Sequence, residues 1–464
     1  MAEGKSLLVE LGTEELPPHA LDALGAAFVR EICDGLAKAG VSAAFDAARA
    51  YVTPRRLAAW IPGVARVQPQ QTLERRGPAL AAGLDANGEP TPALLGFARS
   101  CGVDVAQLEK LETDKGAWFV SRTVQPGQRV AALLPGIIEA ALKNLPIPRP
   151  MRWADHEYSF ARPVHWLVIL HGDAIVDGEV LGLASGRISR AHRFMHPQPV
   201  HVAGADSWVD AMRAGKVLAD PAERRERIRF EVARAALATG GVPRLDDALL
   251  DELANLTEWP VALACAFDPA FLAVPPEALV ATMVLHQKFV PVFGVDGQLT
   301  EHFIGVANIE SSEPEAIRRG YERVIRPRFA DAKFFWDTDL KTPLSDHHAA
   351  LKDVTYQRAL GSLWDKSRRV AELARLLAGQ VGVDAVEAER AASLCKCDLL
   401  TRMVGEFPEL QGVMGRYYAI HDGETPAVAA ALDSHYQPRF GGDAIAPDRL
   451  GQVLSVAERL DTLA

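Results

Sequence analysis

The segment from residue 255 to residue 341 constrains the fold most, because helix and strand signals follow one another closely within it. A Trp-Pro pair, Trp259-Pro260, precedes a long apolar helix candidate. The run 303–308 is typical of a β-strand, and the stretch 323–336 closes the segment with arginines and aromatic residues. Helix and strand signals in one segment predict an α/β domain that ends in an arginine- and aromatic-rich helix.

The closing stretch 323–336 mixes cations with flat rings. Arginine and lysine bind phosphates and aromatic rings stack on bases, so the mixture is typical of a surface that binds RNA. The alternative, which the spacing alone favours, is a core helix whose outer face is merely basic. The candidate phosphate contacts are Arg323, Arg326, Arg328 and Lys333, and the neighbouring rings are Phe329, Phe334, Phe335 and Trp336.

A second basic patch, residues 186–196, contains three arginines and two histidines and no acidic residue. We expect Arg187, Arg190 and Arg193 to contact phosphate groups. The alternative is an arginine-rich loop that pairs with carboxylates of a neighbouring domain. Two pairs of adjacent arginines, Arg55-Arg56 and Arg75-Arg76, are further candidates for phosphate contacts.

The chain opens with a strand signal over 6–11 and a helix signal over 19–39, where apolar residues recur at helical spacing. Glu10, Glu14 and Glu15 cluster near the end of this strand. Such carboxylates could hold a metal or transfer protons, but the preference of helix starts for acidic residues favours a solvated turn.

Further signals predict a helix over 130–145 that is ended by alternating prolines, a hairpin over 164–183 and a charged, solvated helix over 222–237. The predicted fold class is α/β multi-domain, with α+β N-terminal and middle domains on mixed or antiparallel sheets and an all-α C-terminal domain. The predicted divisions are an N-terminal α/β segment (1–70), an inserted α+β domain with the basic loop (71–200), a middle α/β domain (201–343) and a helical domain (344–464).

Composition narrows the function classes. A chain of 464 residues is too long for one hydrophobic core, and 48% apolar with 24% charged residues is typical of a globular protein. The net charge of −10 argues against a general nucleic-acid coat, although local basic patches can still bind RNA. Five scattered cysteines and the lack of a signal-peptide or membrane-span pattern predict a cytoplasmic protein.

Motifs for common catalytic chemistry are missing. The sequence has no P-loop, no Gly-x-Ser-x-Gly elbow and no His-Glu-x-x-His helix. The pair His421-Asp422 raises the alternative of a metal-dependent phosphohydrolase of the HD type, but it is expected to lie in a loop. In the helical run 394–400, where an HD pair belongs, Lys396 stands before Asp398, and a protonated lysine is a poor metal ligand. We therefore predict neither catalytic nor metal-binding residues.

Several long motifs resemble the β subunit of the bacterial, two-subunit type of glycyl-tRNA synthetase, and together they cover essentially the whole chain. They lie at 7–18, 151–153, 160–166, 186–194, 255–260, 274–279, 286–288, 306–310, 323–336, 396–401 and 403–412.

The resemblance implies a non-catalytic subunit that binds and positions tRNA-Gly, with no DNA or membrane partner. A separate α subunit would use ATP and Mg to activate glycine, the two subunits would form a hetero-oligomer, and this chain would hold no cofactor. The helical domain would be HD-like with an eroded metal site. Because the family continues into an anticodon-binding region, we expect a truncated β subunit. The alternatives are a pure assembly scaffold for the α subunit and kinship with the tRNA-binding subunit of amidotransferases.

Overall fold

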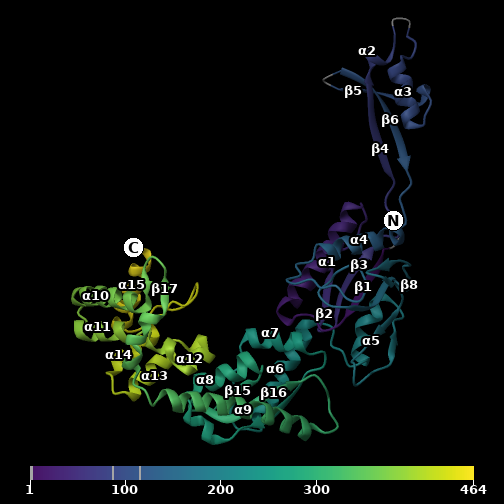
Figure 1. The fold of residues 1–464 in the computed structure, drawn as a ribbon. Helices are drawn as coiled ribbons and strands as arrows, with labels where there is room; N and C mark the ends of the chain where they lie inside the picture. Colours follow the sequence, from purple (N-terminus) through teal and green to yellow (C-terminus); the bar gives the residue numbers. More distant parts are fainter. Residues whose placement is uncertain (1–3, 86–87, 114–115) are drawn as a thin grey trace. The chain divides into compact units, whose positions relative to one another are not determined.

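The computed structural model describes residues 4–85, 88–113 and 116–464 (Figure 1). These residues fall into two compact units. Unit 1 comprises the residues up to Glu226 together with Ala254–Trp259, and unit 2 comprises Arg227–Leu253 and Pro260–Ala464. The sequence analysis predicts four domains, whereas the structure divides into two units. The four boundaries therefore stay a prediction.

Unit 1 is built on a five-stranded antiparallel sheet, and its predicted first strand and first helix are confirmed. The strand order is β2-β3-β1-β7-β8. The bounds are β1 (Lys5–Thr13), β2 (Arg49–Thr53), β3 (Arg56–Val64), β7 (Val164–His171) and β8 (Ala174–Ile175). Leu7, Val9 and Leu11 point to one face, where they share a core with α1 (Leu21–Lys38) and α4 (Val130–Lys143). The alternation of β1 sends Leu8 and Glu10 to the opposite face.

That opposite face of the sheet is covered by α5 (Trp208–Ala214), and its core includes Leu8, Trp166 and Trp208. Short strand pairs complete this part of unit 1. They are β9 (Glu179–Val180) with β10 (Leu183–Ala184), and β11 (Ile188–Arg190) with β12 (Pro199–His201). The predicted hairpin over 164–183 is therefore confirmed only for its β7–β8 part.

A separate three-stranded antiparallel sheet lies within the sequence of unit 1, in the order β4-β6-β5. Its elements are β4 (Gln71–Ala79), α2 (Leu80–Gly83), α3 (Pro92–Cys101), β5 (Glu109–Thr113) and β6 (Gly116–Gln125). It has a small core of its own, made by Leu94, Ala98, Leu108 and Phe119.

Unit 2 combines a four-stranded antiparallel sheet with many helices. The sheet order is β13-β15-β16-β14, which leaves β14 at an edge. The bounds are β13 (Val242–Pro243), β14 (Val261–Ala266), β15 (Val290–Phe293), β16 (Leu299–Ala307), α8 (Pro276–Ala281) and α9 (Pro314–Asp339). Unit 2 also holds most of α6 (Pro221–Leu237) and α7 (Asp247–Leu256), while the start of α6 and the end of α7 belong to unit 1. The strand predicted over 303–308 and the helix predicted over 323–336 are thus confirmed.

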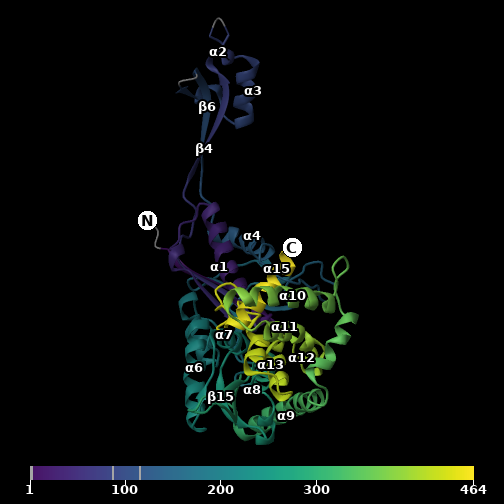
Figure 2. The same cartoon turned by 90° about the vertical axis from the view of Figure 1, so that its left-hand side faces the viewer.

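The end of unit 2 is a helical bundle (Figure 2). Its hydrophobic core is continuous with the residues that α9 buries. Its helices are α10 (Leu363–Val381), α11 (Ala385–Leu394), α12 (Arg402–Glu406), α13 (Val413–His421), α14 (Pro426–Ser434) and α15 (Arg449–Leu463). Two predictions are wrong in detail. A small hairpin of β17 (Thr355–Gln357) and β18 (Gly361–Ser362) interrupts the helical region, and His421 ends a helix rather than lying in a loop.

The fold is therefore a mixed α/β architecture with several antiparallel sheets, as the sequence predicts. Among the described residues, none of the helices is both long and apolar enough to cross a membrane.

Candidate functional site

Helix α9 exposes arginines that form no ion pair with the residues that the structure describes. Pro314 in the first turn supplies the fixed φ angle that a helix start accepts, and Ile325 and Phe329 bury the apolar stripe. Arg323, Arg326 and Arg328 are exposed, and none of their side chains forms an ion pair or hydrogen bond with another described residue. Lys333 differs, because its Nζ lies 2.6 Å from an Asp337 carboxylate oxygen one turn further on.

Helical spacing places Arg319, Arg323 and Arg326 on one exposed face, which we call the arginine row. Arg328 lies on the flank of the helix, about half a turn away from the row. Sequence analysis missed Arg319, although its spacing of four residues from Arg323 was a usable signal. Phe334 continues the same face and is 59% exposed, so it is available for stacking.

The other aromatic residues of α9 serve the core. The Phe329 ring packs edge-on against Phe267 at a centroid distance of 4.8 Å, and the Trp336 ring stacks on Tyr418 at 5.3 Å. The helix therefore has a packed inner face and a basic outer face, and the RNA contacts of the outer face stay a prediction.

Arg56 is a structural residue rather than an exposed one. Its guanidinium is fully buried and lies 3.2 Å from Glu10 Oε1 and 3.1 Å from Glu258 Oε1. Glu10 also accepts hydrogen bonds from Trp208 Nε1 at 2.8 Å and from Ser189 Oγ at 2.7 Å. The prediction that Glu10 belongs to a solvated turn is wrong, because strand alternation turns its side chain into the core.

Arg224 corrects a second expectation, that α6 presents a solvated face. It is fully buried, and its guanidinium donates to the backbone carbonyls of Leu218, Ala219, Ala254 and Val52. Burial lowers the pKa of Arg224 to about 10, so the group stays charged at neutral pH. The run of charged residues in the sequence of α6 does not reveal that Arg224 is the one whose side chain is buried against backbone carbonyls.

Arg187, Arg75 and Arg76 have intramolecular partners. The Arg187 guanidinium donates to the carbonyls of Asp173 at 2.8 Å and Ala203 at 3.3 Å, which links the turn between β7 and β8 to the segment after β12. Arg75 donates to the Ser100 carbonyl at 3.0 Å, and the Arg76 guanidinium lies 3.8 Å from the centroid of the Trp118 ring.

Arg55, Arg190 and Arg193 meet in unit 1 around a small cavity of about 150 Å³, which we call the arginine pocket. Four separate segments supply its walls, so the sequence predicts the arginines but not their meeting. Its lining side chains are Glu14, Arg55, His165, Arg190, Arg193 and His196, with Ala191 and Pro197.

Backbone hydrogen bonds fix the acidic side of the arginine pocket. Thr13 N donates to the Arg55 carbonyl and Glu14 N to the Pro163 carbonyl, each at 2.9 Å. The Glu14 carboxylate lies 2.8 Å from His165 Nε2 and 3.5 Å from an Arg193 nitrogen. Burial raises the pKa of Glu14, but the hydrogen bond from His165 and the charge of Arg193 outweigh it, so the pKa lies below its ordinary value.

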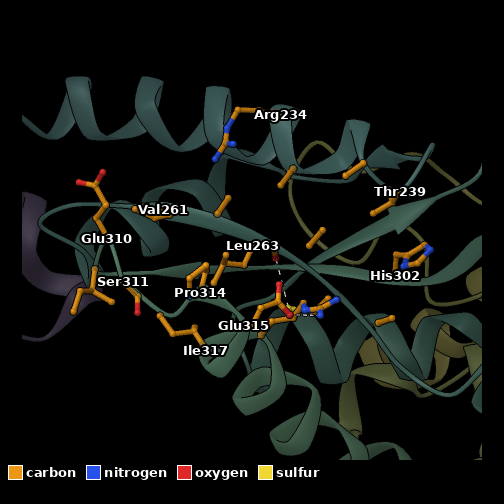
Figure 3. A pocket seen from close by; sticks show the side chains of 18 residues that line it. Arg234, Thr239, Val261, Leu263, His302, Glu310, Ser311, Pro314, Glu315 and Ile317 are labelled. Atoms are coloured by element: carbon orange, nitrogen blue, oxygen red, sulfur yellow. Dashed lines mark hydrogen bonds and ion pairs between the residues drawn. The ribbon is translucent and has the colours of Figure 1, made fainter.

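A larger cavity of about 670 Å³ lies in unit 2 beside the edge strand β14 (Figure 3). Side chains of α6, including Arg234, lie on one side of it, while the start of α9 and the loop before it, with Pro314 and Ser311, lie on the other (Figure 3). Its cations are paired, because Arg318 bonds Glu315 and Arg234 bonds Glu231. The cavity therefore presents no surplus positive charge.

Lys396 occupies the centre of the helical bundle. Its buried Nζ lies 3.0 Å from both Tyr436 Oη and Glu458 Oε1, and 3.3 Å from His435 Nε2. Burial and the neighbouring lysine hold the pKa of His435 well below its ordinary value. Asp398 instead accepts backbone hydrogen bonds from Gly412 and Gly415. Within residues 4–85, 88–113 and 116–464, no three His, Cys, Asp or Glu side chains form a group that could hold a metal ion.

Comparison with known proteins places the chain among the aminoacyl-tRNA synthetases. A family profile described as the glycyl-tRNA synthetase beta subunit matches residues 7–464. The whole chain is 53% identical to the glycine–tRNA ligase beta subunit of Xanthomonas campestris and 51% identical to that of Xylella fastidiosa. It is also 50% identical to that of Chromohalobacter salexigens over 98% of its length. The chain therefore belongs to the glycyl-tRNA synthetase β subunit family, and it spans 66%, 64% and 66% of these relatives' lengths respectively.

Proposed function

We propose that this chain is a tRNA-binding, non-catalytic subunit of a glycine–tRNA ligase. A separate α subunit would use ATP and Mg to form glycyl-adenylate, and this chain would hold tRNA-Gly so that the 3′ end reaches it. Family membership supports the reaction class. The observation that carries the RNA-binding role is the arginine row on α9, whose exposed guanidinium groups have no acidic partner among the described residues.

Physical chemistry favours RNA as the ligand of this row. Phosphate neutralisation releases counterions and supplies affinity without reading sequence. The chain carries a net charge of −10, so most of its surface repels a polyanion and a local basic face directs where RNA docks. Arg328 and Lys333 flank the row, while the pocket residues Arg55, Arg190 and Arg193 are a second set of proposed phosphate contacts. Arg56 is left out because it is buried, and Arg187 because it serves backbone carbonyls.

The test is a salt titration of tRNA-Gly binding with the double variant Arg323→Gln/Arg326→Gln. Losing two phosphate contacts is expected to reduce the slope of log K against log salt by about 1.5. Arg375→Gln, an exposed arginine of α10, is the matched control and is expected to leave the slope unchanged. An unchanged slope in the double variant would remove the row from the RNA interface.

We further propose that the helical bundle is an HD-like domain without a metal. The chain as a whole would then act in the cytoplasm as the RNA-positioning part of an α/β hetero-oligomer. Lys396 supports this, because a buried ammonium group at the bundle centre repels a divalent cation. The phosphohydrolase alternative is disfavoured for the same reason. Metal analysis of the purified chain is expected to find less than stoichiometric metal, and one tightly bound ion per chain would refute the proposal.

A further inference from the structure

We propose that the arginine pocket of unit 1 is a binding site for a single phosphoryl group. The site is separate from the arginine row, and the argument for it does not require that the chain bind tRNA. Its ligand would be recognised as a compact oxyanion, carried either by an RNA backbone or by free phosphate.

The first observation is that two buried nitrogens in the pocket lack hydrogen-bond partners. Arg55 is only 9% exposed, and its Nε is buried without a hydrogen-bond partner. The nearest carboxylate to that nitrogen is Glu15 Oε1, at 4.0 Å. His196 Nδ1 is also buried without a partner, and Arg190 forms no ion pair with the described residues. Unsatisfied buried donors are costly and mark a site whose partner is not part of the protein.

The second observation concerns charge. Burial and the neighbouring Arg193 lower the pKa of Arg55 below its ordinary value, which means that the charged guanidinium is not fully compensated by the carboxylates nearby. The carboxylates that act on these cations are Glu14, Glu15 and the buried Glu258, and Glu258 is itself bonded to Arg56. An anion that bridged the guanidinium groups would supply the missing compensation, and guanidinium forks match the geometry of phosphate oxygens.

The third observation is size. A cavity of about 150 Å³ has room for one tetrahedral oxyanion and a few water molecules, because each water takes roughly 30 Å³. Pockets for whole nucleotides and drug-sized ligands start at about 300 Å³. The pocket therefore selects the phosphoryl group itself, with the remainder of any larger ligand outside.

Glu14 sets the affinity of this site. Its carboxylate reaches the same cations that a phosphate would use, because it bonds His165 and approaches Arg193. Its backbone is fixed by the Glu14 N to Pro163 O hydrogen bond, so only the side chain is able to turn away. A phosphate must therefore compete with the Glu14 carboxylate, and removing that charge is expected to tighten binding.

The test is titration of the full chain with inorganic phosphate, followed by calorimetry and ³¹P NMR. Arg55→Gln and, separately, Arg193→Gln are expected to weaken phosphate binding at least tenfold, and Glu14→Gln to tighten it about tenfold, each tenfold step being about 1.4 kcal/mol. Arg49→Gln, an exposed arginine at the start of β2, is the control and is expected to change nothing. Circular dichroism of each variant establishes that unit 1 stays folded.

Absence of phosphate binding, or binding that neither arginine variant weakens, overturns the proposal. Opposite changes in phosphate affinity for Glu14→Gln and Arg55→Gln support it, because a loss of folding would weaken phosphate binding in both variants.

Competition with tRNA-Gly then identifies the source of the phosphoryl group. Displacement of tRNA by phosphate assigns the pocket to RNA, and phosphate binding without displacement assigns it to a free phosphate ligand. Since the phosphate arm needs no RNA, its failure is distinguishable from failure of the proposed tRNA-binding function.

Discussion

Replacing Arg56 by methionine removes a buried cation that bonds two buried carboxylates. Arg56 lies between Glu10, which is fully buried, and Glu258, which is 2% exposed. Methionine fills a similar volume, so the change tests charge rather than packing. Breaking a buried ion pair by removing one partner costs about 3–5 kcal/mol, because the remaining charge is left uncompensated.

We therefore expect Arg56→Met to lower the free energy of unfolding of unit 1 by about 3–5 kcal/mol. Tryptophan fluorescence during urea unfolding is the assay, since Trp166 and Trp208 both donate hydrogen bonds to Glu10 and report on this cluster. The control is Arg49→Met, on an exposed arginine, with an expected change of less than about 0.5 kcal/mol.

A second variant isolates the charge. In the Arg56→Met background, Glu10→Gln removes one of the uncompensated charges. Its amide oxygen keeps an acceptor for one tryptophan only, because Trp166 donates to Glu10 Oε1 and Trp208 to Glu10 Oε2. The double variant is expected to lose less stability than the sum of the single variants. A loss below about 1 kcal/mol for Arg56→Met alone would show that the buried cluster is not held by charge, and would contradict the account of Arg56 as a core residue.

Two further predictions concern other positions. Gly12→Ala is expected to destabilise unit 1 by about 1–3 kcal/mol in thermal unfolding, because an added Cβ would lie 1.9 Å from ring atoms of Trp166. Gly96→Ala, in open space on α3, is the control, and equal effects would be inconsistent with that close approach. Burial raises the pKa of Asp398 from 3.8 to about 6, so the stability it contributes is complete below about pH 4 and is lost as the pH rises through 6. Urea unfolding at pH 5 and pH 7.5 should show wild type losing stability relative to Asp398→Asn at the higher pH, and a pH-independent difference would refute the assignment.

The local elements of this fold were predictable, because they rest on periodicity. Leu21, Leu24 and Phe28 recur at helical spacing and are buried in α1. The same holds for α9, whose buried residues Ile325 and Phe329 are four apart. Element type and approximate bounds follow from such patterns without knowledge of tertiary contacts.

The fate of individual charged residues was not predictable, because it depends on partners far away in the sequence. Arg56 and Arg55 are neighbours in the chain, yet the first is locked in the core and the second reaches the pocket. Glu14 and His165 are 151 residues apart and lie 2.8 Å from one another. No local pattern encodes such a meeting, so the sequence identifies candidate cations but not the site that they build.

The most direct test of the central claim is tRNA-Gly binding by this 464-residue chain, alone and with the proposed α subunit, against an unrelated tRNA. Salt-sensitive binding of tRNA-Gly in the absence of the α subunit is the predicted result, because the arginine row and the arginine pocket both belong to this chain. No binding in either case would contradict the account, and would leave this chain the role of an assembly scaffold.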